Sequence, residues 1–132
     1  VPEQPNFAPA NWTKFLVSKK EAKACEHSEE GKRYLKQPIN GVPRMHYYKM
    51  FNDTKNAKLR TITSSIYTTN VSALLLDRRF RPVLYRKFHP REVERFMGFP
   101  DGYSSGVARV WRMKALGNAV MPPMANYVLQ YL

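Results

Sequence analysis

The sequence predicts an α+β fold, in which a small, mixed β-rich region is followed by short helices. In the middle third, runs of β-branched and aromatic residues alternate with Gly and Asn turns, which is typical of short strands. The C-terminal third instead contains a segment that Pro90 opens and Gly98 ends, the residue types that commonly bracket a helix. A Pro122-Pro123 pair then predicts the start of a second helix.

Residues 1–43 are expected to form an N-terminal arm followed by a surface helix. Proline favours an extended arm over residues 1–13, because each proline fixes its own backbone and has no NH to donate to a helix. Three prolines lie in this arm: Pro2, Pro5 and Pro9.

The helix in this segment is predicted from about residue 19 to residue 36. Ser18 and Glu21 have the spacing of a capping box, in which each side chain bonds the other residue's backbone NH. Gly31 is the position at which the helix would split, since glycine weakens a helix interior. Apolar residues are few among many charges, so we expect a surface helix with Cys25 as a small buried residue rather than a nucleophile.

Residues 44–87 are expected to form a basic, β-rich region that is entered through a turn. Asn40-Gly41, between Pro38 and Pro43, is a strong signal for a β-hairpin. The strand candidates that follow are short and rich in aromatic, β-branched or leucine residues: 45–51, 60–67, 74–76 and 82–85.

Residues 88–132 are expected to be helical. In the first helix, Pro90 takes the first position and His89 the N-cap. Helical spacing places three apolar side chains on its buried face: Val93, Phe96 and Met97. The same spacing places three charged side chains on its outer face: Arg91, Glu94 and Arg95. The final helix would gather apolar and aromatic side chains on one face: Met124, Tyr127, Val128 and Tyr131.

The charge of the chain predicts a polyanionic partner. The 132 residues have a formal net charge of +12, and the pI is about 10.0. The excess is concentrated in residues 44–87, where ten Lys or Arg residues stand against only Asp53 and Asp77. We therefore expect nucleic acid as the partner. Two alternatives stay open: an acidic protein subunit, or a basic protein without a polyanionic partner.

The lone cysteine excludes an intramolecular disulfide and a cysteine-rich zinc site. No apolar run approaches the roughly 20 residues of a membrane helix, and no signal peptide is recognisable, so the expected location is intracellular. It would be the nucleus in a eukaryote and the cytoplasm or nucleoid in a prokaryote. Because the sequence begins at Val1 rather than Met, we expect a processed chain or a fragment.

Two motifs stand in order in the C-terminal third. The first runs from Arg86 to Asp101 and follows the pattern Arg-x-Leu-Thr-x-Arg-Glu-x-x-Arg-Leu-x-Gly-Phe-Pro-Asp. It departs from the pattern at three positions, because Phe replaces each of the two Leu residues and His89 replaces the Thr. The second, over residues 117–122, reads Gly-Asn-Ala-Val-Met-Pro. Together they resemble the last two motifs of the cytosine-5 DNA methyltransferases. Arg60-Thr61-Ile62-Thr63 is similar to the stretch that closes the family's target recognition region, whereas residues 1–59 resemble no pattern that we can name.

The resemblance implies different roles for the two motifs. The first would be mainly structural, through Arg91, Glu92, Arg95, Gly98, Phe99 and Pro100. For Arg95 a phosphate contact is the alternative. The second would lie beside S-adenosylmethionine, with a tight turn at Gly117 and three cofactor-facing residues: Asn118, Ala119 and Val120. A helix-start turn without a ligand is the alternative for this motif.

Resemblance and charge together give the candidates for binding double-stranded DNA. Resemblance points to Arg60, Thr61 and Thr63. Charge or hydrogen-bonding capacity adds Lys55, Lys58, Ser64, Arg78 and Arg79. Arg and Lys can pair with guanine, but most basic residues on such a face contact phosphate and read no sequence.

No catalytic residue and no metal site are assigned. In the family, a Cys of a Pro-Cys loop attacks the base, helped by a Glu of Glu-Asn-Val and an Arg of Gln-x-Arg-x-Arg, and a Phe-x-Gly-x-Gly loop holds the cofactor. None of these four patterns occurs in the 132 residues. The reaction also requires the target base to be flipped into a pocket.

The resemblance therefore implies the C-terminal portion, or a small subunit, of a DNA (cytosine-5) methyltransferase. It would be inactive without the larger catalytic subunit or the N-terminal portion of the same enzyme. The short helices would complete that partner's Rossmann-like α/β methyltransferase domain. A non-catalytic DNA-binding or regulatory relative is the alternative, and a fragment of an RNA cytosine methyltransferase is a third hypothesis.

Overall fold

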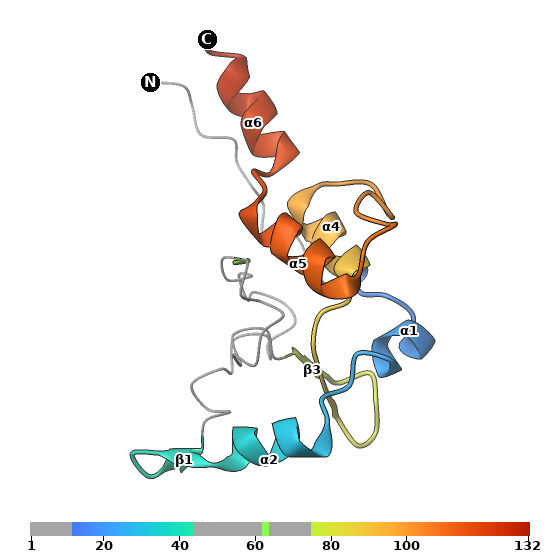
Figure 1. Cartoon of the computed structure of the whole chain (residues 1–132), viewed down its shortest axis with the longest axis vertical. Helices are drawn as coiled ribbons and strands as arrows, with labels where there is room; N and C mark the ends of the chain where they lie inside the picture. The colour runs from blue at the N-terminus through green and yellow to red at the C-terminus, as the bar shows by residue number, and fades with distance from the viewer. Residues whose placement is uncertain (1–11, 44–61, 64–74) are drawn as a thin grey trace.

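The computed structural model of the chain describes residues 12–43, 62–63 and 75–132 (Figure 1). These residues form short helices and two small antiparallel sheets, which confirms the α+β class. The predicted strand 45–51 lies outside the described residues, as does most of the predicted strand 60–67.

The N-terminal segment folds into a 3₁₀ turn, η1 (Trp12–Phe15), and two helices, α1 (Lys19–Lys23) and α2 (Glu29–Lys36). The capping box predicted at Ser18 is confirmed, because its side chain and that of Glu21 bond each other's backbone NH. The single helix predicted over 19–36 is wrong. It breaks ahead of α2, where Glu26 leaves the helix to form an antiparallel bridge with Arg86, and not at Gly31.

Both sheets are two-stranded hairpins. β1 (Pro38–Ile39) pairs with β2 (Val42–Pro43), and Asn40 and Gly41 turn between them with φ of 49° and 78°, which confirms the predicted hairpin. β3 (Leu75–Asp77) pairs with β4 (Leu84–Arg86), with Leu76 opposite Tyr85. The segment between α1 and α2 extends this second sheet, because His27 donates to Tyr85 O and Lys87 donates to Cys25 O, both at 2.9 Å.

The first helix of the C-terminal third, α4 (Pro90–Met97), has the caps that the sequence predicts. His89 accepts from the backbone of Arg91 at 3.1 Å, Glu92 bonds back to the His89 NH, and Gly98 ends the helix in the left-handed conformation. The outer position predicted for Glu94 is wrong. Its side chain is fully buried, because it turns toward the loop that follows the helix.

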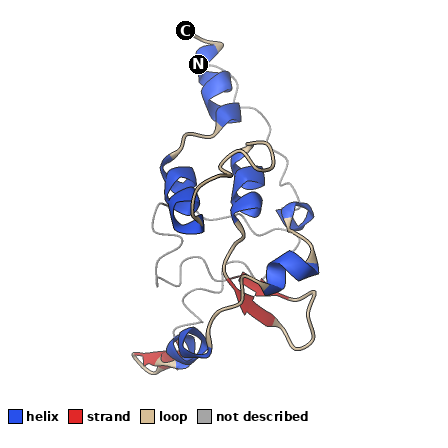
Figure 2. Cartoon of the chain, turned by 45° about the vertical axis from the view of Figure 1, so that its right-hand side comes forward, coloured by secondary structure: helices blue, strands red, loops and turns tan. Residues whose placement is uncertain are grey.

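Two further helices complete the chain, α5 (Arg109–Asn118) and α6 (Pro122–Leu129). The tight turn predicted at Gly117 is wrong, since Gly117 lies inside the last turn of α5. The chain instead becomes extended at Ala119 and again at Met121, where the following proline disfavours helical backbone. In α6 no residue is buried, and the helix projects from the rest of the molecule (Figure 2).

The core joins elements that are distant in the sequence. Its buried residues come from β3, α4, α5 and the segment between β4 and α4: Leu75, Phe88, Val93, Met97, Met113 and Leu116. Phe96 packs edge-on against Phe15 at 5.8 Å and Phe88 at 5.4 Å between ring centroids. The N-terminal segment and the C-terminal helices therefore share one hydrophobic cluster.

A side chain at position 98 is disfavoured for two separate reasons, the backbone conformation of Gly98 and its close contact with Pro123. The φ of Gly98 is +83°, and a Cβ there would lie 2.7 Å from Cγ of Pro123 at the start of α6. We expect Gly98→Ala to lower the free energy of unfolding by about 2–4 kcal/mol, as strain and overpacking add. Urea unfolding measures this effect. Gly106→Ala is the matched control, because Gly106 has φ +94° with nothing within 4 Å of the added carbon. Equal losses in the two variants would show that the Pro123 contact contributes nothing.

Candidate functional site

A buried ion network joins Arg86, the first residue of the first motif, to Glu92 in α4. Arg86 donates from Nε to Asp77 at 2.9 Å and from its terminal nitrogens to Glu92 at 2.9 and 2.8 Å. Glu92 also accepts from the backbone NH of Val17 at 3.0 Å and of His89 at 2.8 Å. Arg86 and Glu92 are fully buried. Each of these charges is paired and hydrogen-bonded, the condition under which buried ions are tolerated.

Arg79, a predicted DNA contact, belongs to the same network. Its guanidinium donates to Asp77 at 2.9 and 2.6 Å and to the carbonyl of Val17 at 2.7 Å. Burial alone would raise the pKa of Asp77, but hydrogen bonds from Arg79 and Arg86 lower it to about 2, so the carboxylate is ionised at neutral pH. Arg79 thus fastens the β3–β4 turn to the chain ahead of α1. Its contact with DNA stays a prediction.

Glu94 organises the loop after α4. It accepts from the backbone NH of Gly102 at 2.7 Å and of Ser104 at 2.9 Å, and from Arg112 of α5 at 3.0 Å. Burial would raise the pKa of Glu94, but the hydrogen bonds from Ser104, Arg112 and Gly102 lower it below its usual value. One carboxylate therefore links α4, α5 and the loop between them.

The other charged residues of α4, Arg91 and Arg95, contact the N-terminal segment, and Arg95 also contacts the loop after the helix. Arg95 binds both oxygens of Asp101, at 2.7 and 2.6 Å, and donates to the carbonyl of Phe15 at 3.0 Å. Arg91 donates to Glu21 of α1 at 2.6 Å. Their contacts within the chain suit the structural role that the resemblance implies, which stays a prediction.

Phe99 and Pro100, the remaining residues of that motif, follow α4. The ring of Phe99 is half-buried against the hydrophobic cluster and stacks on Tyr103 with 4.6 Å between centroids. Pro100 is exposed. The structure thus places the motif at the meeting point of α4, the following loop and the core.

The predicted cofactor-facing residues lie together where α5 meets α6. Asn118 ends α5 with an exposed side chain, Ala119 packs against the core, and Val120 is 69% exposed. The C-terminus of a helix presents unpaired carbonyls and a partial negative charge. This edge therefore offers acceptors suited to a positively charged group, and it is open to solvent on the side of Val120.

The structure describes only some of the predicted DNA-binding residues. Thr63 and Arg78 have exposed side chains. Lys58, Arg60 and Thr61 lie outside the described residues, as do Lys55 and Ser64. Their contacts with DNA stay predictions.

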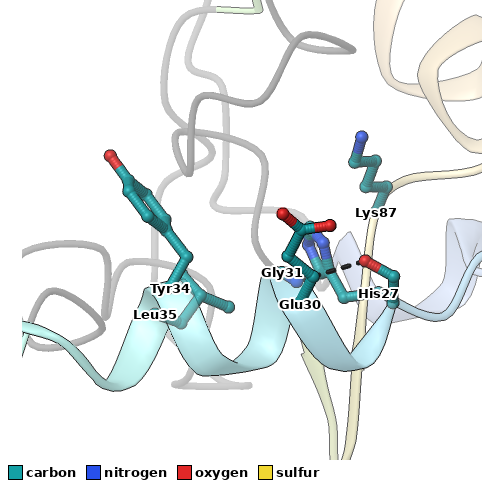
Figure 3. A pocket seen from close by; sticks show the side chains of 7 residues that line it. His27, Glu30, Gly31, Tyr34, Leu35 and Lys87 are labelled. Atoms are coloured by element: carbon teal, nitrogen blue, oxygen red, sulfur yellow. Dashed lines mark hydrogen bonds between the residues drawn. The ribbon is translucent and has the colours of Figure 1, made fainter.

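A cavity of about 370 Å³ lies between α2 and the chain after β4, in a place that the sequence did not indicate (Figure 3). Figure 3 shows Glu30 and Tyr34 rising from one side of α2, with Lys87 on the neighbouring segment. Burial and the nearby Lys87 and Lys32 lower the pKa of His27 to about 4, so its imidazole is neutral. His27 and Lys87 are brought together by β pairing, and no sequence spacing links them.

Cys25 is buried beside the C-terminal helices. It is 3% exposed, and its sulfur accepts from Arg109 of α5 at 2.9 Å. Burial raises the pKa of the thiol, and the neighbouring Arg109 and Arg86 offset only part of this shift. The burial predicted for this cysteine is confirmed, although Cys25 lies just after α1 and not within a helix.

Within the described ranges, no helix has the length and apolarity required to cross a bilayer. In the same part of the chain, no three His, Cys, Asp or Glu side chains are grouped closely enough to hold a metal ion.

Comparison with known proteins gives one family. The model of the C-5 cytosine-specific DNA methylase family matches residues 3–132. No curated protein and no solved structure matches the chain.

Proposed function

The chain belongs to the C-5 cytosine-specific DNA methylase family, and we propose that it is the C-terminal portion or small subunit of a DNA (cytosine-5) methyltransferase. In this role it contributes DNA target recognition and one edge of the S-adenosylmethionine pocket. The catalytic cysteine, most of the cofactor pocket and the main sheet come from a larger subunit or from the N-terminal portion of the same enzyme.

The burial of Cys25 is the observation that most directly supports a catalytic cysteine outside this chain. Cytosine-5 transfer requires a thiolate that reaches C6 of the base. The one thiol of the chain is 3% exposed, has a raised pKa and follows Ala24 rather than a proline. It is therefore unsuited to attack a flipped base, and the nucleophile has to come from elsewhere.

The α5–α6 junction is suited to hold part of the cofactor. S-adenosylmethionine supplies an activated methyl group and has a positively charged sulfonium and ammonium. The exposed amide of Asn118 and the carbonyls that end α5 provide acceptors for such a charge. The backbone of Ala119 and the exposed side chain of Val120 complete this edge, and the partner would close it.

The exposed apolar surface of α6 supports the presence of a partner. Three of its large side chains are about half exposed or more: Met124 at 46%, Val128 at 50% and Leu129 at 64%. Tyr131, just after the helix, is 56% exposed. A projecting helix that buries none of its residues is stabilised when this surface is covered. We place it against the sheet of the catalytic portion.

Methyl transfer tests the proposal. The chain is assayed alone and together with the polypeptide of the same source whose sequence contains Pro-Cys and Glu-Asn-Val. We expect negligible transfer of labelled methyl groups from S-adenosylmethionine to duplex DNA by the chain alone, and restored transfer in the mixture. Cys25→Ala is expected to keep the restored activity, because Cys25 has no part in the reaction.

Three outcomes would overturn the proposal. Robust transfer by the chain alone would place a nucleophile within it. An inactive mixture, in which the chain still binds DNA, would identify the non-catalytic relative instead. Transfer to structured RNA in preference to duplex DNA would change the substrate class.

A further inference from the structure

The turn between β3 and β4 is held against α1 by contacts from both sides. Arg79 bonds Asp77 at the end of β3 and the carbonyl of Val17, one residue ahead of the α1 cap. On the outside, Nζ of Lys19 lies 5.8 Å from the centroid of the Phe80 ring. These contacts hold the turn beside the start of α1.

This surface gathers positive charge, and we call it the basic ridge: Lys19 and Lys23 of α1 with Arg78 and Arg81 of the turn. All four side chains are exposed. Arg81 donates to the carbonyl of Arg78 at 3.2 Å, which holds the two arginines together. Within the described part of the chain, Lys19, Arg78 and Arg81 pair with no carboxylate, whereas Lys23 binds Glu26 at 2.6 Å.

The acidic groups around the basic ridge are already engaged. Glu21 binds Arg91, and Glu26 binds Lys23 and Lys32. Asp77 is 2% exposed and lies between two arginines. Among the ridge residues, the charges of Lys19, Arg78 and Arg81 are therefore left for an external anion.

A cavity of about 320 Å³ lies beside these cations. Lys23, Lys32 and Arg81 line it together with the apolar side chains of Phe80, Pro82 and Leu84. Glu26 also lines it and pairs with Lys23 and Lys32, so Arg81 is the lining cation without a carboxylate partner among the described residues. Cations next to an apolar wall suit a sugar–phosphate unit, whose phosphate binds Arg or Lys and whose deoxyribose packs on carbon.

We propose that the basic ridge binds the phosphodiester backbone of duplex DNA irrespective of base sequence. The inference rests on the proposed function and extends it to α1, which lies outside the region 44–87 to which the charge pattern assigned DNA binding. It also divides the arginines of the turn. Arg78 and Arg81 contact phosphate, and Arg79 is a positioning residue that keeps the turn beside α1.

The salt dependence of DNA binding tests this inference. The chain and the variant Lys19→Gln/Arg78→Gln/Arg81→Gln are titrated with several unrelated duplexes between 50 and 200 mM salt. Affinity falls as salt rises, and each phosphate contact adds about 0.9 to the steepness of log K against log salt. Losing three contacts should therefore make this dependence shallower by about 2.7. Wild-type affinity should then fall about 40-fold further than variant affinity over this range, equally for every duplex.

The control removes the same charge elsewhere. Arg33, Lys36 and Lys114 are exposed on α2 and α5, so Arg33→Gln/Lys36→Gln/Lys114→Gln changes the net charge equally and should keep the wild-type slope. Circular dichroism confirms that both variants fold. Equal slopes for wild type and the ridge variant, or equal losses in ridge and control variants, would overturn the inference and leave the proposed function standing. A wild-type chain that binds no duplex at 50 mM salt would overturn both.

Discussion

Replacing Glu92 with alanine is expected to lower the free energy of unfolding by about 3–5 kcal/mol. The substitution removes the carboxylate that receives two bonds from Arg86 and leaves this fully buried guanidinium with Asp77 as its one acidic partner among the described residues. The backbone NH groups of Val17 and His89 lose their acceptor as well. Urea unfolding of Glu92→Ala against wild type measures the loss.

Two further variants separate charge pairing from other effects. Glu30→Ala removes an exposed glutamate from α2 and should change stability by no more than about 0.5 kcal/mol. Arg86→Met/Glu92→Leu removes both partners and should be less destabilising than Glu92→Ala alone, because no charge is then stranded. If the double variant is the less stable of the two, the stranded charge is not the cause.

Replacing Glu94 with alanine is expected to cost about 2–4 kcal/mol and to release the loop after α4. The change leaves the NH groups of Gly102 and Ser104 without their acceptor and removes the carboxylate that pairs with Arg112. Amide hydrogen exchange gives the local readout. Exchange at Gly102 and Ser104 should speed up more than exchange in the core of α4.

The control for this variant is Arg112→Ala, in which Glu94 keeps its bonds to the loop. It should lose stability while leaving exchange at Gly102 close to wild type. Gly102 is the readout for this control, because Arg112 also donates to the hydroxyl of Ser104 at 2.9 Å. If Glu94→Ala leaves exchange at the Gly102 and Ser104 amides unchanged, the carboxylate does not hold the loop.

Local sequence signals predicted the elements that are defined by their own ends. The helix at 90–97 is marked by His89, Pro90 and Gly98, and the first hairpin by Asn40-Gly41, so residues within a few positions determine each structure. The helix α5 lacks such a mark, since Ala108 at its N-cap provides no side-chain hydrogen bond.

Long-range contacts determined what the sequence did not show. The break ahead of α2 depends on the bridge from Glu26 to Arg86, and the burial of Glu94 depends on a loop and on Arg112. The candidate sites follow the same rule. Charge alone selected Arg78 and Arg79 together, and the positions of Asp77 and of the Val17 carbonyl distinguish the exposed Arg78 from Arg79, which is held by contacts within the chain.

The backbone of Val17 sets a limit on how this polypeptide can be shortened. Its NH donates to Glu92 and its carbonyl accepts from Arg79, while its side chain is 2% exposed. A version trimmed to start at Ser18 would lose a hydrogen-bond donor to the buried carboxylate of Glu92 and an acceptor for the partly exposed guanidinium of Arg79, although no ionisable side chain of the network had been removed. Dissecting the protein into separately expressed pieces therefore has to keep residue 17 on the same piece as α4.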